Sequence, residues 1–298
     1  MGKSFTLTAA CSRRLVNLNA MVYRIYRTID GIVIEGEDGL YATDTQDWNT
    51  FINDDALFQK IRKLLPSLRR IPNSDTQLRS GLLPPIDKQE IWASGVTYFR
   101  SREARMEESR QGGDFYDNVY EAERPELFYK ANAQRTVGPE QGVNIRADST
   151  WDVPEPELTL FISSGGRIAG YTIGNDMSSR SIEGENPLYL PQAKVFEKCA
   201  GLGPCLTVMD EAFPADTQIS MEISRGGKRV FADSISVSSM KRTFDELVSY
   251  LFRACEFPFG CFLMTGTGIV PPPEFTLQSG DEIRITIDPI GTLVNFVN

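Results

Sequence analysis

The stretch Pro154-Glu155-Pro156-Glu157-Leu158 opens the segment that decides the fold of this chain. The residues from Leu158 to Ile162 predict a strand, Ser164 to Arg167 predict a turn, and Ile168 to Ile173 predict a returning strand. Each of the two prolines fixes its own φ and pushes the preceding residue toward extended geometry. The segment therefore predicts a hairpin with a rigid, extended entry.

This hairpin is expected to gather three carboxylates. Side chains alternate along an extended chain, so Glu155 and Glu157 point to the same side. A hairpin returns the end of its second strand to the start of the first, so Asp176 can join them. Such a cluster is costly unless a cation occupies it, and oxygen ligands favour Mg²⁺, Mn²⁺ or Ca²⁺. The alternative is that both glutamates are solvated on an edge strand, but the rigid entry favours a metal site.

The absence of histidine limits the chemistry that the chain can perform. There is none among the 298 residues, which excludes a Ser-His-Asp triad, a histidine zinc helix and any histidine general base. Proton transfers must use carboxylates, lysine, tyrosine or metal-bound water. The net charge of −9 argues against a nucleic-acid surface. It still permits an anionic small molecule, because a bound cation reverses the local field.

Cysteine usage and hydropathy predict a cytoplasmic protein. The chain has no Cys-x-x-Cys spacing, no signal-like start and no apolar run long enough to span a membrane. An odd number of scattered cysteines favours reduced thiols. They are Cys11, Cys199, Cys205, Cys255 and Cys261.

Two domains are expected, a small N-terminal α/β domain over residues 1–85 and a catalytic domain over residues 86–298. In the N-terminal part, Met21 to Arg27 and Ile32 to Glu37 predict a hairpin, and Asp55 to Leu65 predict an amphipathic helix. Gly81 to Pro85 predict a linker to the second domain.

The larger domain is expected to be mostly β. Its predicted strands are Ile91 to Gly95, Leu127 to Lys130, Ile219 to Ser224, Ser234 to Val237, Gly260 to Gly266 and Glu282 to Ile287, with one helix at Phe244 to Ala254. The charged residues from Tyr98 to Tyr120 favour a solvated helical pair, with a mobile lid as the alternative. Arg180 and Glu185 are expected in a polar loop. The fold class is therefore α+β, with a rolled, mixed β-sheet.

Several segments together resemble the fumarylacetoacetate hydrolase family. They are Leu127-Phe128-Tyr129-Lys130, Glu155-Pro156-Glu157-Leu158, Tyr171-Thr172-Ile173-Gly174-Asn175-Asp176, Gln192-Ala193-Lys194 and Thr265-Gly266-Thr267. The resemblance implies a rolled β-fold, a homodimer or a larger assembly of dimers, and Mg²⁺ or Mn²⁺ held by Glu155, Glu157 and Asp176. It also implies that a 2-oxo acid binds the metal through its carboxylate and keto oxygen.

Longer runs resemble the subgroup of this family that dehydrates 2-keto-3-deoxy-D-arabinonate. They are Arg124-Pro125-Glu126, Trp151 to Glu157 and Glu185 to Lys194. Family hydrolases carry a histidine–glutamate pair after the turn at Ser94-Gly95, which this chain lacks. The resemblance implies that Glu126 and Lys194 are the acid/base residues of a Mg²⁺-dependent hydro-lyase. Its reaction would convert a 2-keto-3-deoxy pentonate to 2-oxoglutarate semialdehyde.

This chemistry suits the residues present. Dehydration begins with loss of a proton from C3, and a metal that chelates the substrate would stabilise the resulting enolate. A carboxylate or a lysine can remove that proton and protonate the departing C4 hydroxyl. The alternatives are that Lys194 is a structural ion-pair residue and that Glu126 is a carboxylate without a catalytic role.

Six further residues are candidates for substrate contact: Ser94, Gly95, Tyr98, Arg102, Lys130 and Thr267. The turn that contains Thr267 supplies backbone N–H groups and hydroxyls suited to a substrate oxygen. Tyr98 and Arg102 face whatever the lid covers. Lys130 is either a contact or an electrostatic support, and Arg180 is either a partner of a ligating carboxylate or a surface charge.

Two other functions stay open at this point. One is hydrolysis of a 2,4-diketo acid with C–C bond cleavage, and the other is a catalytically silent, metal-binding paralogue. The stereochemistry of the sugar acid depends on contacts that the sequence does not place.

Overall fold

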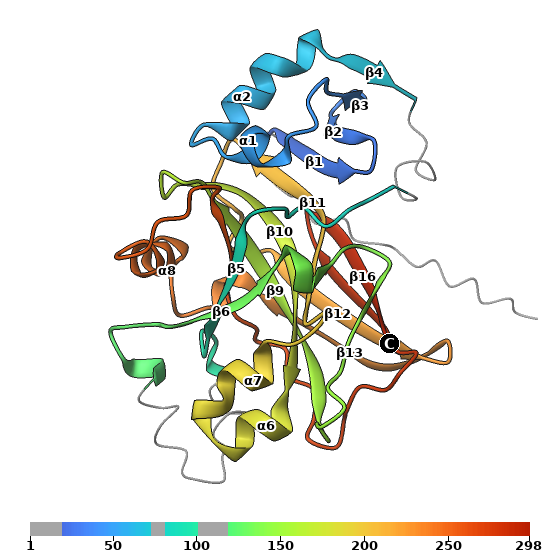
Figure 1. The fold of residues 1–298 in the computed structure, drawn as a ribbon, viewed down its shortest axis with the longest axis vertical. Coiled ribbons are helices and arrows are strands. Elements are labelled where there is room, and N and C mark those ends of the chain that lie inside the picture. Colours follow the sequence, from blue (N-terminus) through green and yellow to red (C-terminus); the bar gives the residue numbers. More distant parts are fainter. Residues whose placement is uncertain (1–19, 73–80, 101–118) are drawn as a thin grey trace, which may run out of the picture.

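The computed structural model describes residues 20–72, 81–100 and 119–298, which form two β-sheets with short helices around them (Figure 1). The larger sheet has eleven strands, in the order β4-β3-β2-β1-β11-β10-β9-β14-β5-β6, with β7 paired to β11. The smaller sheet has five, in the order β13-β12-β15-β16-β8.

The strands of the first half are β1 (Val22–Thr28), β2 (Gly31–Gly36), β3 (Gly39–Ala42), β4 (Arg69–Ile71), β5 (Glu90–Gly95), β6 (Glu126–Asn132), β7 (Thr136–Val137) and β8 (Gln141–Val143). Those of the second half are β9 (Asp152–Ile162), β10 (Ile168–Ser179), β11 (Ala200–Met209), β12 (Gln218–Arg225), β13 (Lys228–Ser236), β14 (Cys261–Met264), β15 (Glu282–Ile287) and β16 (Gly291–Val297). The helices are α1 (Trp48–Ile52), α2 (Leu57–Leu64), α6 (Arg180–Glu185), α7 (Leu190–Lys194) and α8 (Phe244–Leu251).

The hairpin β9–β10 lies at the centre of the larger sheet, and all eleven residues of β9 are buried. Its register pairs Glu155 with Asp176 and Glu157 with Gly174, which confirms the prediction that the hairpin brings Asp176 beside the two glutamates. The strand is longer than expected, because it begins at Asp152 and includes both prolines. On its other side, β14 pairs only with Thr159 to Ile162. The prolines therefore lie in the part of β9 that has no neighbouring strand on that side, so their missing N–H groups remove no hydrogen bond to β14.

The two sheets pack face to face over a common core, which gives the mostly β, mixed-sheet fold that the sequence predicted. Side chains from the hairpin, such as Leu158 and Ile173, meet alternate residues of the smaller sheet, such as Ile219 and Ile285. Alternate residues of a strand share a face, so one apolar face of each sheet is buried. Helix α8 covers other strands of the large sheet through Leu247 and its neighbours.

The N-terminal residues extend the large sheet. Strand β1 pairs with β11, for example Ile25 with Leu206, and the predicted hairpin and amphipathic helix are present as β1–β2 and α2. Trp48 and Phe51 of α1 pack into the same apolar cluster as Phe161 of β9. A division at residue 85 into separately folding domains stays a prediction.

The segment after β10 differs from the sequence prediction. It was expected to be a polar loop, with Phe244 to Ala254 as the only helix of this half, but it forms α6 and α7. Ser179 caps α6, because its hydroxyl accepts a hydrogen bond from the Ile182 amide. Asn186 caps a following 3₁₀ turn, and Pro191 lies in the first turn of α7, where its missing N–H costs nothing.

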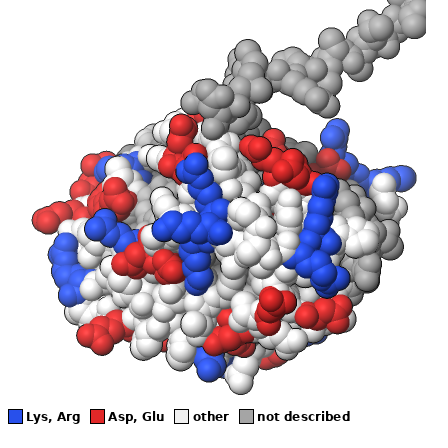
Figure 2. Space-filling view, turned by 90° about the horizontal axis from the view of Figure 1, so that it is seen from above, with Lys and Arg blue, Asp and Glu red and all other residues white. Residues whose placement is uncertain are grey.

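The described surface carries charges of both signs. Figure 2 looks down on the molecule from the top of Figure 1 and shows Lys and Arg side chains interspersed with Asp and Glu on that face. No helix in the described parts of the chain is both long and apolar enough to cross a membrane.

Candidate metal and substrate site

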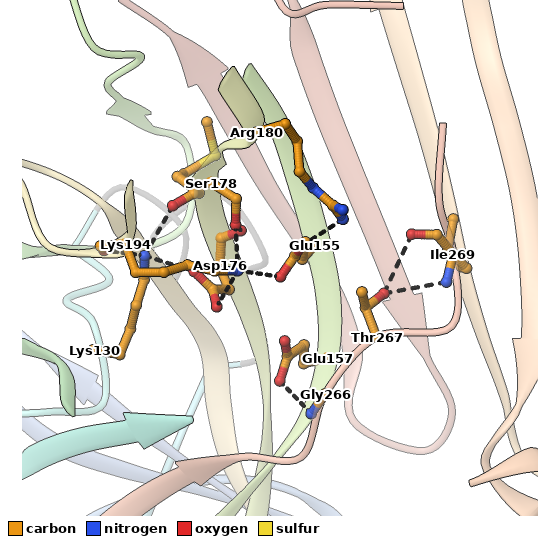
Figure 3. A network of polar contacts seen from close by, with 11 residues as sticks. Lys130, Glu155, Glu157, Asp176, Ser178, Arg180, Lys194, Gly266, Thr267 and Ile269 are labelled. Atoms are coloured by element: carbon orange, nitrogen blue, oxygen red, sulfur yellow. Dashed lines mark hydrogen bonds and ion pairs between the residues drawn. The ribbon is translucent and has the colours of Figure 1, made fainter. Parts of the chain in front are cut away.

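The hairpin brings Glu155, Glu157 and Asp176 together at the centre of the fold (Figure 3). All three are buried, and one carboxylate oxygen of each lies within 4.8 Å of the others. This convergence follows from the strand register, because Glu155 pairs directly with Asp176 and Glu157 lies two residues along on the same face. The carboxylate cluster predicted from the sequence is therefore present.

Lys194, at the end of α7, contacts two of these carboxylates. Its Nζ donates hydrogen bonds to Glu155 Oε2 at 2.5 Å, to Asp176 Oδ2 at 3.2 Å and to Ser178 Oγ at 2.6 Å. The side chain is 1 % exposed, so these contacts are shielded from solvent. Helix α7 thus delivers an ammonium group to the carboxylates from a different part of the chain (Figure 3).

Two further buried cations contact the same cluster. The Nζ of Lys130 lies 2.6 Å from Asp176 Oδ1 and donates to the carbonyls of Met177 and Lys194. Arg180 Nη2 donates to Glu155 Oε1 at 2.6 Å. Three cations therefore accompany three carboxylates, so the buried charges of the cluster balance.

Glu157 differs from the other two carboxylates in its surroundings. Burial raises its pKa well above the model-peptide value of 4.5, and the charges of Asp176 and Glu155 raise it further. The Gly266 amide donates to Glu157 Oε2 at 2.5 Å and acts in the opposite direction. Desolvation is the largest of these effects, so the pKa of Glu157 stays raised.

The donor set fits a hard divalent cation. All the converging atoms are carboxylate oxygens, which Mg²⁺, Mn²⁺ and Ca²⁺ prefer. Asp176 Oδ1 is buried without an aligned hydrogen-bond donor, because the close approach of Lys130 does not have the geometry of a hydrogen bond. A cation would add a second charged partner to this oxygen, besides the ion pair with Lys130.

A pocket opens beside the carboxylates. Besides the three acids, its wall includes Ser94, Gly95, Glu126, Glu183, Lys194 and Thr267. On the β5–β6 side, Gly95 pairs with Glu126, and Ser94 Oγ donates to the Glu126 carbonyl at 3.0 Å. A Cβ on Gly95 would lie 2.1 Å from Glu126 Oε2, so only glycine leaves room for this carboxylate.

The remaining candidates from the sequence lie in other places. Lys130 is fully buried against the cluster, and Tyr98 is buried at the start of the segment after β5. Burial and the charge of Glu157 raise the pKa of Tyr98. Neither belongs to the wall of the pocket that the described residues form, so their contacts with substrate stay predictions. Arg102 lies outside the described residues.

The structure adds Glu183 to the pocket and shows that Arg180, which is buried, lines the same pocket and bonds Glu155. Both belong to α6, where a spacing of three places them on one helical face. Because a polar loop was predicted for this segment, Glu183 was not among the predicted site residues. The available signal was Ser179 as an N-cap just ahead of the pair.

Comparison with known proteins gives concordant findings. Residues 91–298 match the family described as fumarylacetoacetate (FAA) hydrolase C-terminal. The chain is 52 % identical over 214 residues to a probable 2-keto-3-deoxyxylonate dehydratase of Haloferax volcanii, covering 72 % of this chain and 73 % of that protein. It is 42 % identical over 214 residues to 2-dehydro-3-deoxy-D-arabinonate dehydratase of Saccharolobus solfataricus, a match that covers 70 % of this chain and 72 % of that protein.

Solved structures extend the likeness to most of the chain. The fold is similar to that of 2-keto-3-deoxy-D-arabinonate dehydratase complexed with magnesium and 2,5-dioxopentanoate, with a TM-score of 0.77 and 32 % identity. The match covers 93 % of this chain and 98 % of that one. It therefore includes the N-terminal residues that the family match leaves out.

Proposed function

This chain belongs to the fumarylacetoacetate hydrolase family, and from that premise we propose that it is a Mg²⁺-dependent dehydratase of 2-keto-3-deoxy pentonates. The product is 2,5-dioxopentanoate, which is 2-oxoglutarate semialdehyde. Two similar proteins bear dehydratase names for substrates of this class, and the solved dehydratase complex contains magnesium and this product.

One observation carries the proposal. A pocket in a chain without histidine is lined by three clustered carboxylates, a buried lysine and two further glutamates, Glu126 and Glu183. Family hydrolases need a histidine–glutamate pair to activate water, whereas β-elimination of water needs only an acid and a base near the carbon chain. The residues present therefore favour elimination over hydrolysis.

Glu155, Glu157 and Asp176 are the proposed ligands of Mg²⁺, and they are the same three residues that were predicted as ligands from the sequence. When bound, the cation supplies Lewis-acid stabilisation of negative charge at the keto oxygen of the substrate. Lys130 and Arg180 hold Asp176 and Glu155 in place through ion pairs, as partners of ligating carboxylates commonly do.

Glu126 and Lys194 are the proposed proton-transfer residues. Lys194 lies against the carboxylates, and Glu126 lies on the pocket wall built by β5 and β6. The substrate chain would lie between them, so that one group removes the C3 proton and the other protonates the leaving C4 hydroxyl. Ser94, Gly95 and Thr267 are the proposed contacts for substrate oxygens.

The reaction is tested with metal-stripped protein and 2-keto-3-deoxy-D-arabinonate, with and without Mg²⁺. We expect metal-dependent loss of water and the appearance of an aldehyde proton in the NMR spectrum. Cleavage of a 2,4-diketo acid into two acids, with no reaction of the deoxy sugar acid, would instead support hydrolysis. Binding of Mg²⁺ without turnover of this acid, its stereoisomers or a diketo acid would support the catalytically silent paralogue.

Assembly and location are part of the same proposal. The family resemblance favours a homodimer or a larger assembly of dimers, which light scattering would measure directly. The composition of the chain favours a cytoplasmic enzyme, and fractionation of the source cells would test that.

A further inference from the structure

Glu183 is a buried carboxylate that the proposed chemistry at C3 and C4 does not use. It belongs to α6, is 5 % exposed and lines the same pocket as Glu126 and Lys194. It is not part of the three-carboxylate cluster. A buried carboxylate on the wall of a reaction pocket calls for a chemical role.

The position of Glu183 along the pocket follows from its helix. Arg180 donates to Glu155 at 2.6 Å, which fixes the first residue of α6 against the carboxylate cluster. Glu183 is three residues farther on the same helical face, where Cβ atoms are about 5–6 Å apart. Its carboxylate therefore lies on the α6 side of the pocket, and in the binding mode that we infer the far end of the substrate, which carries C5, meets this side.

The proposed reaction needs a proton transfer at that far end. Removal of the C3 proton and departure of the C4 hydroxyl give 5-hydroxy-2-oxopent-3-enoate and water. This enone is an isomer of 2,5-dioxopentanoate and still carries an alcohol at C5. To reach the aldehyde, a C5–H bond must break, and its electron pair must form a C4=C5 bond.

The rest of the isomerisation balances without any other reactant. The electron pair of the C3=C4 bond moves toward C2, and a proton is added at C3. The resulting C5 enol gains a proton at C4 and loses its hydroxyl proton to become the aldehyde. Two protons leave and two are added, so the step consumes no oxidant and no reductant. It requires only a base close to C5.

Resting on the function proposed above, we propose that Glu183 is this base and removes the C5 proton. Lys194 is held by Glu155, Asp176 and Ser178 against two of the proposed metal ligands, so we assign its ammonium group to the atoms next to the chelated end of the substrate. Glu126 extends from the β6 side of the pocket. Three proton-transfer groups then serve three positions along the carbon chain.

The test compares two glutamates of the same short helix. Glu183→Gln keeps the size of the buried side chain but removes the base. Glu185→Gln makes the same change at the last residue of the helix, which is exposed. Each variant, loaded with Mg²⁺, is given 2-keto-3-deoxy-D-arabinonate in D₂O, and NMR follows C3 deuteration, vinyl protons and the aldehyde proton. Glu183→Asp keeps the carboxylate and serves as the conservative variant.

We expect Glu183→Gln to form aldehyde at least about 100-fold more slowly while C3 deuteration continues and the vinyl signals of the enone accumulate. Glu183→Asp should restore part of the aldehyde rate, and Glu185→Gln should behave like the wild type. Aldehyde formation by Glu183→Gln at the wild-type rate, or loss of C3 deuteration in parallel with the aldehyde, would overturn the assignment. A wild-type protein that deuterates C3 but forms no aldehyde would overturn it too, whereas no reaction at C3 at all would refute the proposed function itself.

Discussion

Replacing Lys194 with methionine separates a catalytic role from a structural one. The ammonium group donates to Glu155 and Asp176 in a site that is closed to solvent. Its removal leaves three carboxylates with two cations, Lys130 and Arg180. One buried negative charge then lacks compensation. Removing one partner of a buried pair typically costs about 3–5 kcal/mol.

The loss should appear as lower thermal stability in the absence of metal. At roughly 2–4 °C per kcal/mol for a large domain, we expect Tm to fall by about 6–20 °C. A divalent cation restores positive charge to the cluster, so Mg²⁺ should recover much of this loss. At a concentration of 100 times Kd, binding alone contributes about 2.7 kcal/mol.

Turnover should respond differently from stability. Loss of a positioned acid or base typically costs about 10²–10⁴-fold in rate. We therefore expect Lys194→Met to lose activity by that factor while Mg²⁺ affinity, measured by calorimetry, is retained. Lys63→Met, an exposed change on α2, serves as the matched control. Loss of Mg²⁺ binding together with activity, or a Tm that does not respond to Mg²⁺, would refute this reasoning and make Lys194 a structural residue.

Three further predictions test other parts of the site. Gly95→Ala should displace the Glu126 carboxylate, because a Cβ at this position would lie 2.1 Å from Glu126 Oε2. We expect this displacement to lower kcat by about 10²-fold. An unchanged kcat in a variant with a native circular dichroism spectrum would contradict the prediction. Because the pKa of Glu157 is raised, the metal-free protein should lose stability as pH rises from about 4.5 through the raised value, whereas Mg²⁺ affinity should increase over the same range as the proton leaves. Calorimetry in buffers of different ionisation enthalpy should detect that proton release, and binding without proton release at low pH would count against the assignment. Lys130→Met should lower the free energy of unfolding by about 3–5 kcal/mol. Mg²⁺ should restore less of this stability than in Lys194→Met, because the Met177 and Lys194 carbonyls also lose their hydrogen-bond donor. Denaturation midpoints of both variants with and without Mg²⁺ test this, and equal recovery in the two would contradict it.

The central hairpin could be predicted because its information is local. The turn residues, the alternation and the two flanking strands all lie between Pro154 and Asp176, so the meeting of the carboxylates follows from chain geometry. The extent of β9 was underestimated because Pro154 and Pro156 normally interrupt a strand. They are accommodated only because β14 stops short of them, and the sequence of β9 does not contain that fact.

Other parts depend on contacts between residues far apart in the chain. The pairing of Ile25 with Leu206 joins segments that no short window contains. Helix α6 has six residues, which is too short for a periodic pattern, so Glu183 was not predicted. Arg180 was predicted as one of two alternatives, and its contact with Glu155 confirms the role of partner to a carboxylate. Lys130 is fully buried only because Asp176 and two carbonyls of other elements receive its ammonium group. A lysine in a short strand gives no such indication by itself.

The origin of the site residues from separate elements has a consequence for how such enzymes can diversify. The three carboxylates belong to one hairpin in the middle of a sheet, whereas Glu126, Glu183 and Lys194 come from β6, α6 and α7. Mutations at Glu126 and Glu183 can therefore alter which bond of a bound keto acid reacts, whereas mutations at Lys130, Arg180 or Lys194 in the same elements also remove partners of the carboxylates. In laboratory evolution, libraries confined to Glu126 and Glu183 should yield new substrate preferences at little cost in folding, whereas libraries in the hairpin should yield mainly inactive protein.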